Sequence, residues 1–108
     1  MSIKTSRPVF AGKEYVVRYE GLVAINRYNE DASKVYYEII DGPGKGASGD
    51  ADLDVNLLSE GVYAVSWQEA SGATIVHVDD FINGTSLTYF TTAENDFYRL
   101  KGSLSEQN

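Results

Sequence analysis

Short segments in which apolar residues recur at every second position constrain this chain more than any other feature of its sequence. In residues 62–69, Tyr63, Val65 and Trp67 alternate with small or polar residues, which is the period of a β-strand. Turn-forming residues separate eight such segments, which span residues 14–20, 22–28, 34–40, 52–58, 62–69, 73–81, 86–92 and 97–104. No segment of ten or more residues keeps a helical period. The pattern therefore predicts an all-β protein of about eight strands.

Strands that follow one another through short turns favour an antiparallel meander. A meander is most economically closed into a small up-and-down β-barrel, because closure removes the exposed edges of the sheet; an open β-sandwich is the alternative. The length of 108 residues suits a single domain over residues 1–108. Residues 1–9 are expected to form an N-terminal tail and residues 105–108 a frayed C-terminal tail. The glycine-rich residues 41–50 are predicted to be a loop at the barrel mouth.

The apolar half of each alternating segment predicts which side chains point into the barrel. The predicted inward set is Tyr15, Val17, Tyr19, Val35, Tyr37, Leu53, Val55, Leu57, Tyr63, Val65 and Trp67. The chain has eight tyrosines, and a buried tyrosine hydroxyl needs a hydrogen-bond partner. Water or a polar ligand in a cavity would supply such partners, so the composition favours a hollow barrel over a solid one.

Charge and composition exclude several classes of partner and site. The formal net charge of −7 repels the phosphates of nucleic acids and of anionic membranes, so neither is an expected partner. The chain has no cysteine, which excludes disulfides and thiolate metal sites. Its first residues contain no apolar segment typical of a signal peptide. We therefore expect a cytoplasmic protein.

Three stretches resemble a known family: EGVYAVSWQE (60–69), FAGKEYVVRY (10–19) and SGATIVHV (71–78). They are similar to the phenolic acid decarboxylases and to the related short domains named after molybdenum cofactor biosynthesis protein F. The resemblance runs from about Phe10 to about Gly102. It implies a calycin-type, lipocalin-like β-barrel with an internal pocket.

The resemblance also implies a role for Glu69, at the end of the strand 62–69. In the decarboxylases the matching glutamate points into the barrel and takes part in catalysis without a cofactor. Two tyrosines of the first strand and a loop arginine complete that site. Here Tyr19 matches the second tyrosine, Val17 stands in place of the first, and Lys45 is the only cation of the loop at 41–50. The resemblance thus implies Glu69 and Tyr19 as catalytic residues and no cofactor.

His77, the only histidine, is the third candidate catalytic residue, and its direction depends on the register of the hairpin that contains it. A two-residue turn pairs Glu69 with Thr74 and leaves His77 outside the barrel. One more loop residue sets Trp67 opposite His77 and places the imidazole inside. The resemblance favours the second register, because Ile75 then falls where the decarboxylases have an inward valine.

A metal site is not expected. The candidate ligand set would be Glu69, His77 and Asp79, and a single histidine is few for zinc or iron.

Three functions are compatible with these features. The first is a barrel that binds a small apolar or aromatic molecule, with a wall formed by Tyr15, Val17, Tyr37, Tyr63, Val65, Trp67 and Ile75. The second is a cofactor-independent lyase or isomerase that uses Glu69 as general acid or base with Tyr19. The third is a solid barrel whose surface or homodimer contact is the function. The binding barrel is our first hypothesis.

We predict that the protein converts p-coumaric or ferulic acid to the corresponding vinylphenol in trace amounts at most. A decarboxylase of this kind holds the substrate carboxylate through several donors at once, and this chain lacks the first tyrosine and the arginine. Chromatography of the incubated acids tests the prediction. Robust turnover would contradict it and would show that another cation, such as Lys45, replaces the arginine.

Overall fold

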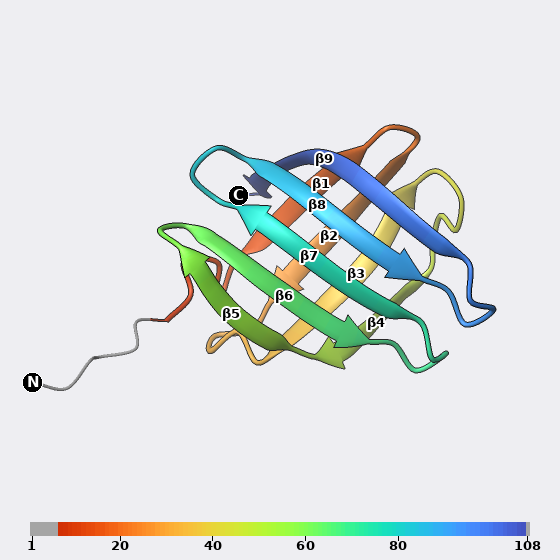
Figure 1. Ribbon diagram of the computed structural model, residues 1–108, viewed down its shortest axis with the longest axis horizontal. Coiled ribbons are helices and arrows are strands. Elements are labelled where there is room, and N and C mark those ends of the chain that lie inside the picture. The colour runs from red at the N-terminus through yellow and green to blue at the C-terminus, as the bar shows by residue number, and fades with distance from the viewer. Residues whose placement is uncertain (1–6, 108) are drawn as a thin grey trace, which may run out of the picture.

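Nine antiparallel strands form one sheet in the order β4-β3-β2-β1-β9-β8-β7-β6-β5 (Figure 1). The structure, a computed structural model, describes residues 7–107. The strands are β1 (Glu14–Tyr19), β2 (Leu22–Tyr28), β3 (Lys34–Asp41), β4 (Ser48–Asp52), β5 (Asp54–Ser59), β6 (Val62–Gln68), β7 (Thr74–Asp80), β8 (Thr85–Thr91) and β9 (Phe97–Gln107). The sheet curls into a nearly closed barrel, which confirms the predicted all-β fold. Residues 7–107 contain no helix suited to crossing a membrane.

The first and last strands of the meander pair with each other. β1 lies antiparallel to β9, from Glu14 opposite Gln107 to Tyr19 opposite Gly102. The strands approach so closely that a Cβ atom on Gly102 would lie 2.3 Å from the carbonyl oxygen of Arg18. The two edges of the sheet are therefore β4 and β5, and the chain crosses from one edge to the other at Leu53.

The structure has nine strands where about eight were predicted, because two predicted strand boundaries were wrong. The segment 52–58, predicted as one strand, is split between β4 and β5, and β4 begins at Ser48, inside the predicted loop 41–50. β4 lacks apolar alternation because its residues beside the interior are small. Gly49 pairs with Tyr37 of β3, and a Cβ atom there would lie 2.6 Å from the Tyr37 hydroxyl oxygen. Tyr37 fills the space that a larger residue would need.

The ends of the chain differ in part from expectation. The sequence predicted a frayed tail over residues 105–108. Instead, β9 continues to Gln107, because β1 pairs with residues 102–107. Residue 108 lies outside the described residues. Of the predicted N-terminal tail, residues 1–6 also lie outside the described range, and residues 7–9 belong to no strand.

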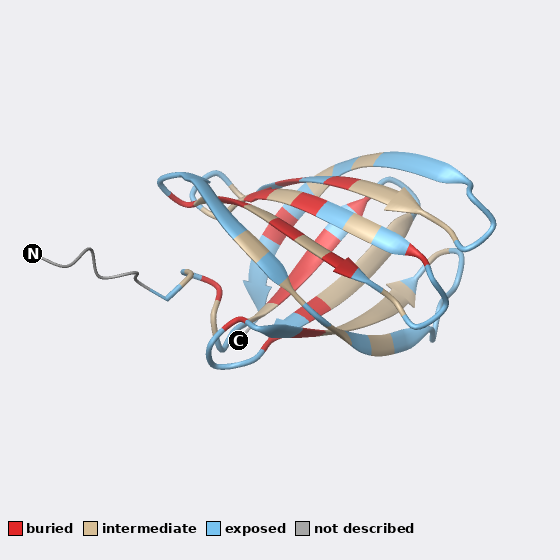
Figure 2. Cartoon of the chain, turned by 60° about the horizontal axis from the view of Figure 1, so that its bottom comes forward, coloured by how far each residue is buried: buried red, intermediate tan, exposed pale blue. Residues whose placement is uncertain are grey.

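The predicted inward set is buried with one exception. Buried positions alternate with exposed positions along the strands (Figure 2). Tyr37, Leu53 and Val55 are half-buried, and the buried members are Tyr15, Val17, Tyr19, Val35, Tyr63, Val65 and Trp67. The prediction for Leu57 was wrong, since this side chain is 65% exposed. The pairing of β5 with β6 shifts register between Leu57 and Ser59, which breaks the alternation at the end of an edge strand.

An aromatic cluster closes one end of the barrel. Phe10, in the turn before β1, is fully buried, and its ring centroid lies 4.5 Å from that of Tyr28, 5.0 Å from that of Phe81 and 5.2 Å from that of Tyr63. Tyr15 packs against Phe81 at 5.0 Å. Aromatic pairs at these separations are typical of a packed core. The rings around Phe10 are tightly packed at this end of the barrel, and a larger cavity lies at the other end.

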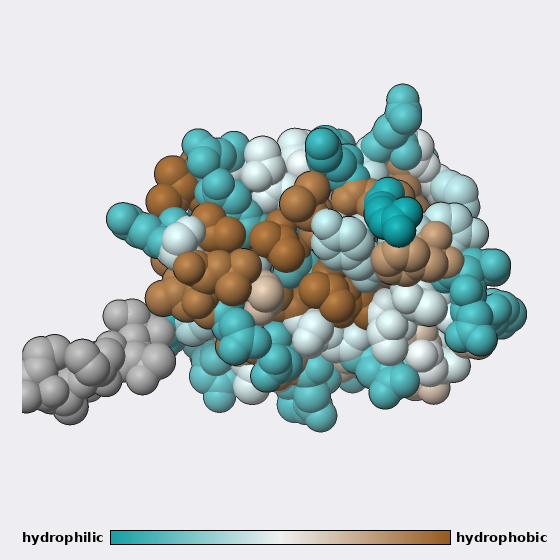
Figure 3. Space-filling model, in the orientation of Figure 1, coloured by the Kyte–Doolittle hydropathy of each residue, from teal (hydrophilic) through white to brown (hydrophobic). Residues whose placement is uncertain are grey.

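Apolar side chains also gather on the outer face of the barrel, over β5 to β8 (Figure 3). The exposed large hydrophobic residues of this region are Leu57, Leu58, Val76, Ile82 and Leu87. These side chains are exposed, so they do not contribute to the packed interior.

We predict that Trp67→Ala lowers the free energy of unfolding by about 3–5 kcal/mol, because it removes a large buried side chain. Leu57→Ala, on the neighbouring strand, is expected to change it by less than about 1 kcal/mol, because Leu57 is largely exposed. Urea denaturation monitored by circular dichroism measures both. Equal effects of the two substitutions would contradict the assignment of Trp67 to the core and Leu57 to the surface.

Candidate functional site

A partly enclosed cavity of about 260 Å³ occupies the end of the barrel opposite the aromatic cluster around Phe10. Most of its lining is apolar. The aromatic lining residues are Tyr19, Tyr37, Trp67 and Phe90, and the aliphatic ones are Leu22, Ala24, Ile39, Ile75 and Leu100. The polar ones are Asn26, Glu69, His77 and Thr88. Pro43, Gly44 and Ala47 line the mouth, so the predicted loop 41–50 does contribute to the entrance.

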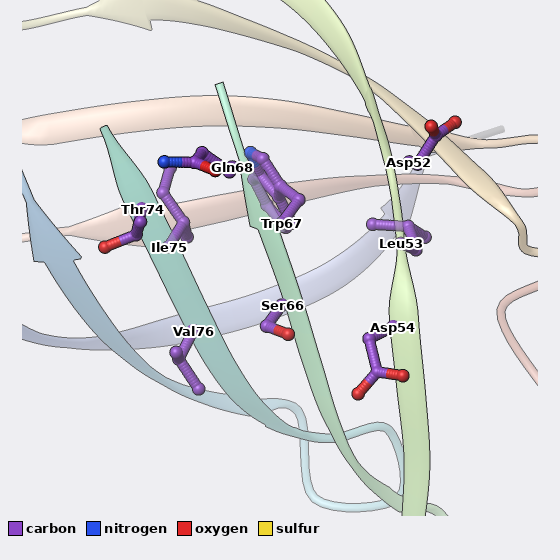
Figure 4. A pocket seen from close by; sticks show the side chains of 9 residues that line it. All are labelled: Asp52, Leu53, Asp54, Ser66, Trp67, Gln68, Thr74, Ile75 and Val76. Atoms are coloured by element: carbon purple, nitrogen blue, oxygen red, sulfur yellow. The ribbon is translucent and has the colours of Figure 1, made fainter. Parts of the chain in front are cut away.

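A larger depression of about 490 Å³ is open to the outer surface between the start of β5, the end of β6 and the start of β7 (Figure 4). Ser66, Gln68, Thr74 and Val76 contribute side chains from β6 and β7, and Asp52 and Asp54 flank it. This depression is open to solvent and brings no buried polar group together. Ligand sites are usually concave, mostly apolar and supplied with a few convergent polar groups. The cavity inside the barrel meets that description better, although it is smaller.

Three nearly parallel rings form one wall of the cavity. The indole ring of Trp67 stacks on the phenol ring of Tyr37 with centroids 6.1 Å apart and planes at 21°. It stacks on the imidazole ring of His77 with centroids 5.2 Å apart and planes at 17°. The rings come from β3, β6 and β7, so the wall exists only in the folded barrel.

The hairpin between β6 and β7 adopts neither of the two registers considered from the sequence. Trp67 lies opposite Ile75, and His77 lies opposite Val65. The turn closes where the amide of Glu69 donates to the carbonyl of Ala73 at 2.8 Å and the amide of Gly72 donates to the carbonyl of Glu69 at 2.9 Å. The predicted pairs of Glu69 with Thr74 and of Trp67 with His77 are both wrong. The register is shifted by two residues from the favoured one, which keeps His77 inside, at 4% exposed.

His77 belongs to a buried polar network that joins β7 and β8. Its Nδ1 lies 3.3 Å from Asp79 Oδ1, 3.3 Å from Ser86 Oγ and 3.1 Å from Thr88 Oγ1. Ser86 also donates to Asp79 Oδ1 at 2.5 Å. The Tyr19 hydroxyl of β1 hydrogen-bonds to the Thr88 hydroxyl, which extends the network across the barrel.

Two buried polar atoms have no hydrogen-bond partner among the described residues. One is Asp79 Oδ2, the second oxygen of the network carboxylate, and the other is the Tyr28 hydroxyl. Buried polar groups are normally paired, so these two mark an unusually polar interior. Burial and the Asp79 charge raise the pKa of Tyr28 well above its usual value. Burial, with a smaller contribution from Asp79, raises the pKa of Tyr19 to about 12. Both phenols therefore keep their protons at neutral pH.

Glu69 lies at the rim of the cavity and is half-buried. Its Oε2 accepts a hydrogen bond from Trp67 Nε1 at 3.5 Å. Burial raises the pKa of the Glu69 carboxyl, and the Trp67 bond offsets this in part. Burial, followed by the Glu69 charge, raises the pKa of Tyr37. The carboxylate thus lies near the rings of the wall.

The structure brings together part of the predicted site. Tyr19, Tyr37, Trp67, Glu69, Ile75 and His77 all line the cavity. The other predicted wall residues lie elsewhere in the packed core: these are Tyr15, Val17, Tyr63 and Val65. Glu69 does not reach the network of His77 and Asp79, and within residues 7–107 no three histidine or acidic side chains are placed to hold a metal ion.

Several site residues were missed by the sequence analysis, above all Ser86 and Thr88. They alternate on β8 just as His77 and Asp79 alternate on β7, and the register sets Thr88 opposite His77 and Ser86 opposite Asp79. Polar residues at every second position of two adjacent strands are the signal that could have revealed the network. Alternation alone does not say which face of a strand is inside.

Comparisons with known proteins agree with this architecture. A family model described as MoaF-like matches residues 11–105. A crystal structure of a "putative beta-lactamase" from Burkholderia vietnamiensis is 50% identical in sequence, with a TM-score of 0.92 over 95% of this chain and 100% of that one. No curated protein is significantly similar to the chain.

We predict that Thr88→Val lowers the free energy of unfolding by about 1–3 kcal/mol, because it leaves the buried Tyr19 hydroxyl without its partner while keeping the shape of the side chain. Thr74→Val, the same change at an exposed position of β7, is expected to stay within about 0.5 kcal/mol of the parent. Denaturant midpoints of the two variants test this, and a Thr88→Val variant as stable as the parent would show that the network contributes no stability.

Proposed function

The chain belongs to the MoaF-like family, and we propose that it binds a small apolar or aromatic molecule inside its barrel. The observation that carries this proposal is the cavity of about 260 Å³, lined by aromatic and aliphatic side chains and open past the loop of residues 42–47. Small barrels of this kind either fill their interior with side chains or hold one small ligand. This barrel is packed solid only around Phe10.

The size of the cavity limits the ligand. Sites for drug-sized molecules measure about 300–1,000 Å³, so this one suits a molecule with about one ring and a short substituent. The parallel rings of Tyr37 and Trp67 support a flat ligand, which gains by stacking. Tyr19, Thr88 and His77 supply hydrogen-bonding groups deeper in the lining.

A second candidate function is cofactor-independent acid–base catalysis. The observation in its favour is the network in which Asp79 contacts His77 and Thr88 connects His77 to Tyr19, because His77, Thr88 and Tyr19 line the cavity. A histidine oriented by a carboxylate is a common general base. Glu69 at the rim would be a second titrating group. NMR spectra of a bound ligand that change with time to those of a product would favour this function.

The sequence of this chain does not support the β-lactamase activity that the name of the Burkholderia structure gives. Serine β-lactamases of class A use a Ser-x-x-Lys motif, which the sequence lacks. Zinc-dependent hydrolysis requires several histidine, cysteine or carboxylate ligands, and the chain has one histidine and no cysteine. The shared feature that supports our proposal is the barrel itself.

We predict that Ala24→Leu weakens binding of the neutral probe 2-phenylethanol by at least about five-fold, because the larger side chain fills the cavity. Ala64→Leu, the same change on the outward-facing side of β6, is expected to leave the affinity unchanged. NMR titration of ¹⁵N-labelled protein measures both affinities and shows which amides respond. Equal affinities in the two variants, or responses confined to the outer face, would contradict binding inside the barrel.

A further inference from the structure

The charged lining of the cavity consists, among residues 7–107, of one carboxylate. Among the described residues that line it there is no lysine or arginine, whereas Glu69 contributes a carboxylate. Lys45 belongs to the mouth loop but is exposed, and none of the ion pairs found within residues 7–107 includes Glu69. Glu69 is therefore a partly desolvated carboxylate, and no cationic side chain within residues 7–107 forms an ion pair with it.

His77 does not change this balance. It is the one lining residue that could gain a positive charge, and its Nδ1 lies 3.3 Å from Asp79 Oδ1. If His77 is protonated, the Asp79 carboxylate, fully buried beside it, offsets the charge. If His77 is neutral, Asp79 adds a second negative charge to the interior. In both states the cavity keeps a net negative charge.

Aromatic rings lie beside the unpaired carboxylate. Trp67 Nε1 donates to Glu69 Oε2, so the edge of the indole ring is at the carboxylate, and the Tyr37 ring stacks on that indole. Both faces of the indole are covered, by the rings of Tyr37 and His77, so these rings fix the position of the Glu69 carboxylate and offer apolar contact to a ligand beside it. A positive group that contacts Glu69 would also lie close to these rings.

From these observations we propose that the cavity selects an organic cation, a small aromatic or alkyl ammonium compound, with the Glu69 carboxylate as its counter-ion. The ammonium group contacts the Glu69 carboxylate at the rim, and the apolar part of the ligand extends into the barrel. An organic carboxylate is disfavoured, because no lining cation compensates its charge. The proposal rests on ligand binding in this cavity and names the ligand class.

Burial of Glu69 supports this assignment. Desolvation raises the pKa of its carboxyl, which means that the folded protein holds the ionised form at a cost. A bound ammonium group would remove that cost by supplying the missing opposite charge. The net charge of −7 also attracts cations to the protein over longer distances.

Three probes of matched shape test the proposal: 2-phenylethylamine, 2-phenylethanol and 3-phenylpropanoate, which carry a positive, a neutral and a negative end on the same ring. Titration calorimetry with the full chain at neutral pH is expected to show the amine binding at least about ten-fold more tightly than the alcohol, with the carboxylate weakest. Glu69→Gln is expected to reduce the affinity for the amine to that for the alcohol and to leave the alcohol unchanged. Glu60→Gln removes the same charge at the exposed β5–β6 turn and is the matched control, expected to alter neither.

The outcomes separate this proposal from the proposed function. Equal affinities for amine and alcohol, or an amine affinity that survives Glu69→Gln, would overturn the selection of cations. If Ala24→Leu still weakened alcohol binding by at least about five-fold, ligand binding in the barrel would stand. Failure of all three probes to bind would count against both. An equal loss of amine affinity in Glu60→Gln would assign the effect to net charge and would also overturn the role of Glu69.

Discussion

The pairing of β1 with β9 joins the two ends of the meander, and the interior depends on it. Without this pairing the strands would form two separate sheets, β1–β4 and β5–β9, and side chains of β1 would not be held against those of β8. With it, Tyr19 of β1 reaches Thr88 of β8, and Tyr37 of β3 stacks on Trp67 of β6. The wall of rings and the polar network are both products of closure. Each combines neighbouring strands, β6 with β7 or β7 with β8, with one strand that is not hydrogen-bonded to them, β3 for the wall and β1 for the network.

The aromatic residues serve two different purposes at the two ends of the barrel. Around Phe10, rings from the first turn and from several strands fill the interior. At the other end small residues such as Ala24 and Ala47 leave space, and Trp67 and Tyr37 become walls. The solid end provides most of the tightly packed core. His77, Thr88 and Glu69 face the hollow end, whereas Asp79 and Ser86 lie deeper, with Asp79 opposite Tyr63 of the packed end.

The interior is costly in electrostatic terms. Asp79 is fully buried with one carboxylate oxygen unpaired among the described residues, and Glu69 is half-buried without a cation. Such groups lower stability unless a ligand or a reaction uses them, and they are typical of functional sites. The ligand binding and charge selection that we propose would give Glu69 such a role.

The sequence by itself determined the all-β class, the barrel and the inward direction of most alternating residues, because side-chain direction in a strand is a local property with a period of two. The similarity of residues 60–69 and 10–19 to a known family also directed attention to Glu69 and Tyr19, which line the cavity. Only the tertiary structure decided the strand that begins at Ser48, the exposure of Leu57 and the register that sets Val65 opposite His77. It also decided that Tyr15 and Tyr63 fill the solid end while Tyr37 faces the cavity. Register, strand pairing and the division of the interior depend on contacts between distant segments, and no local periodicity records them.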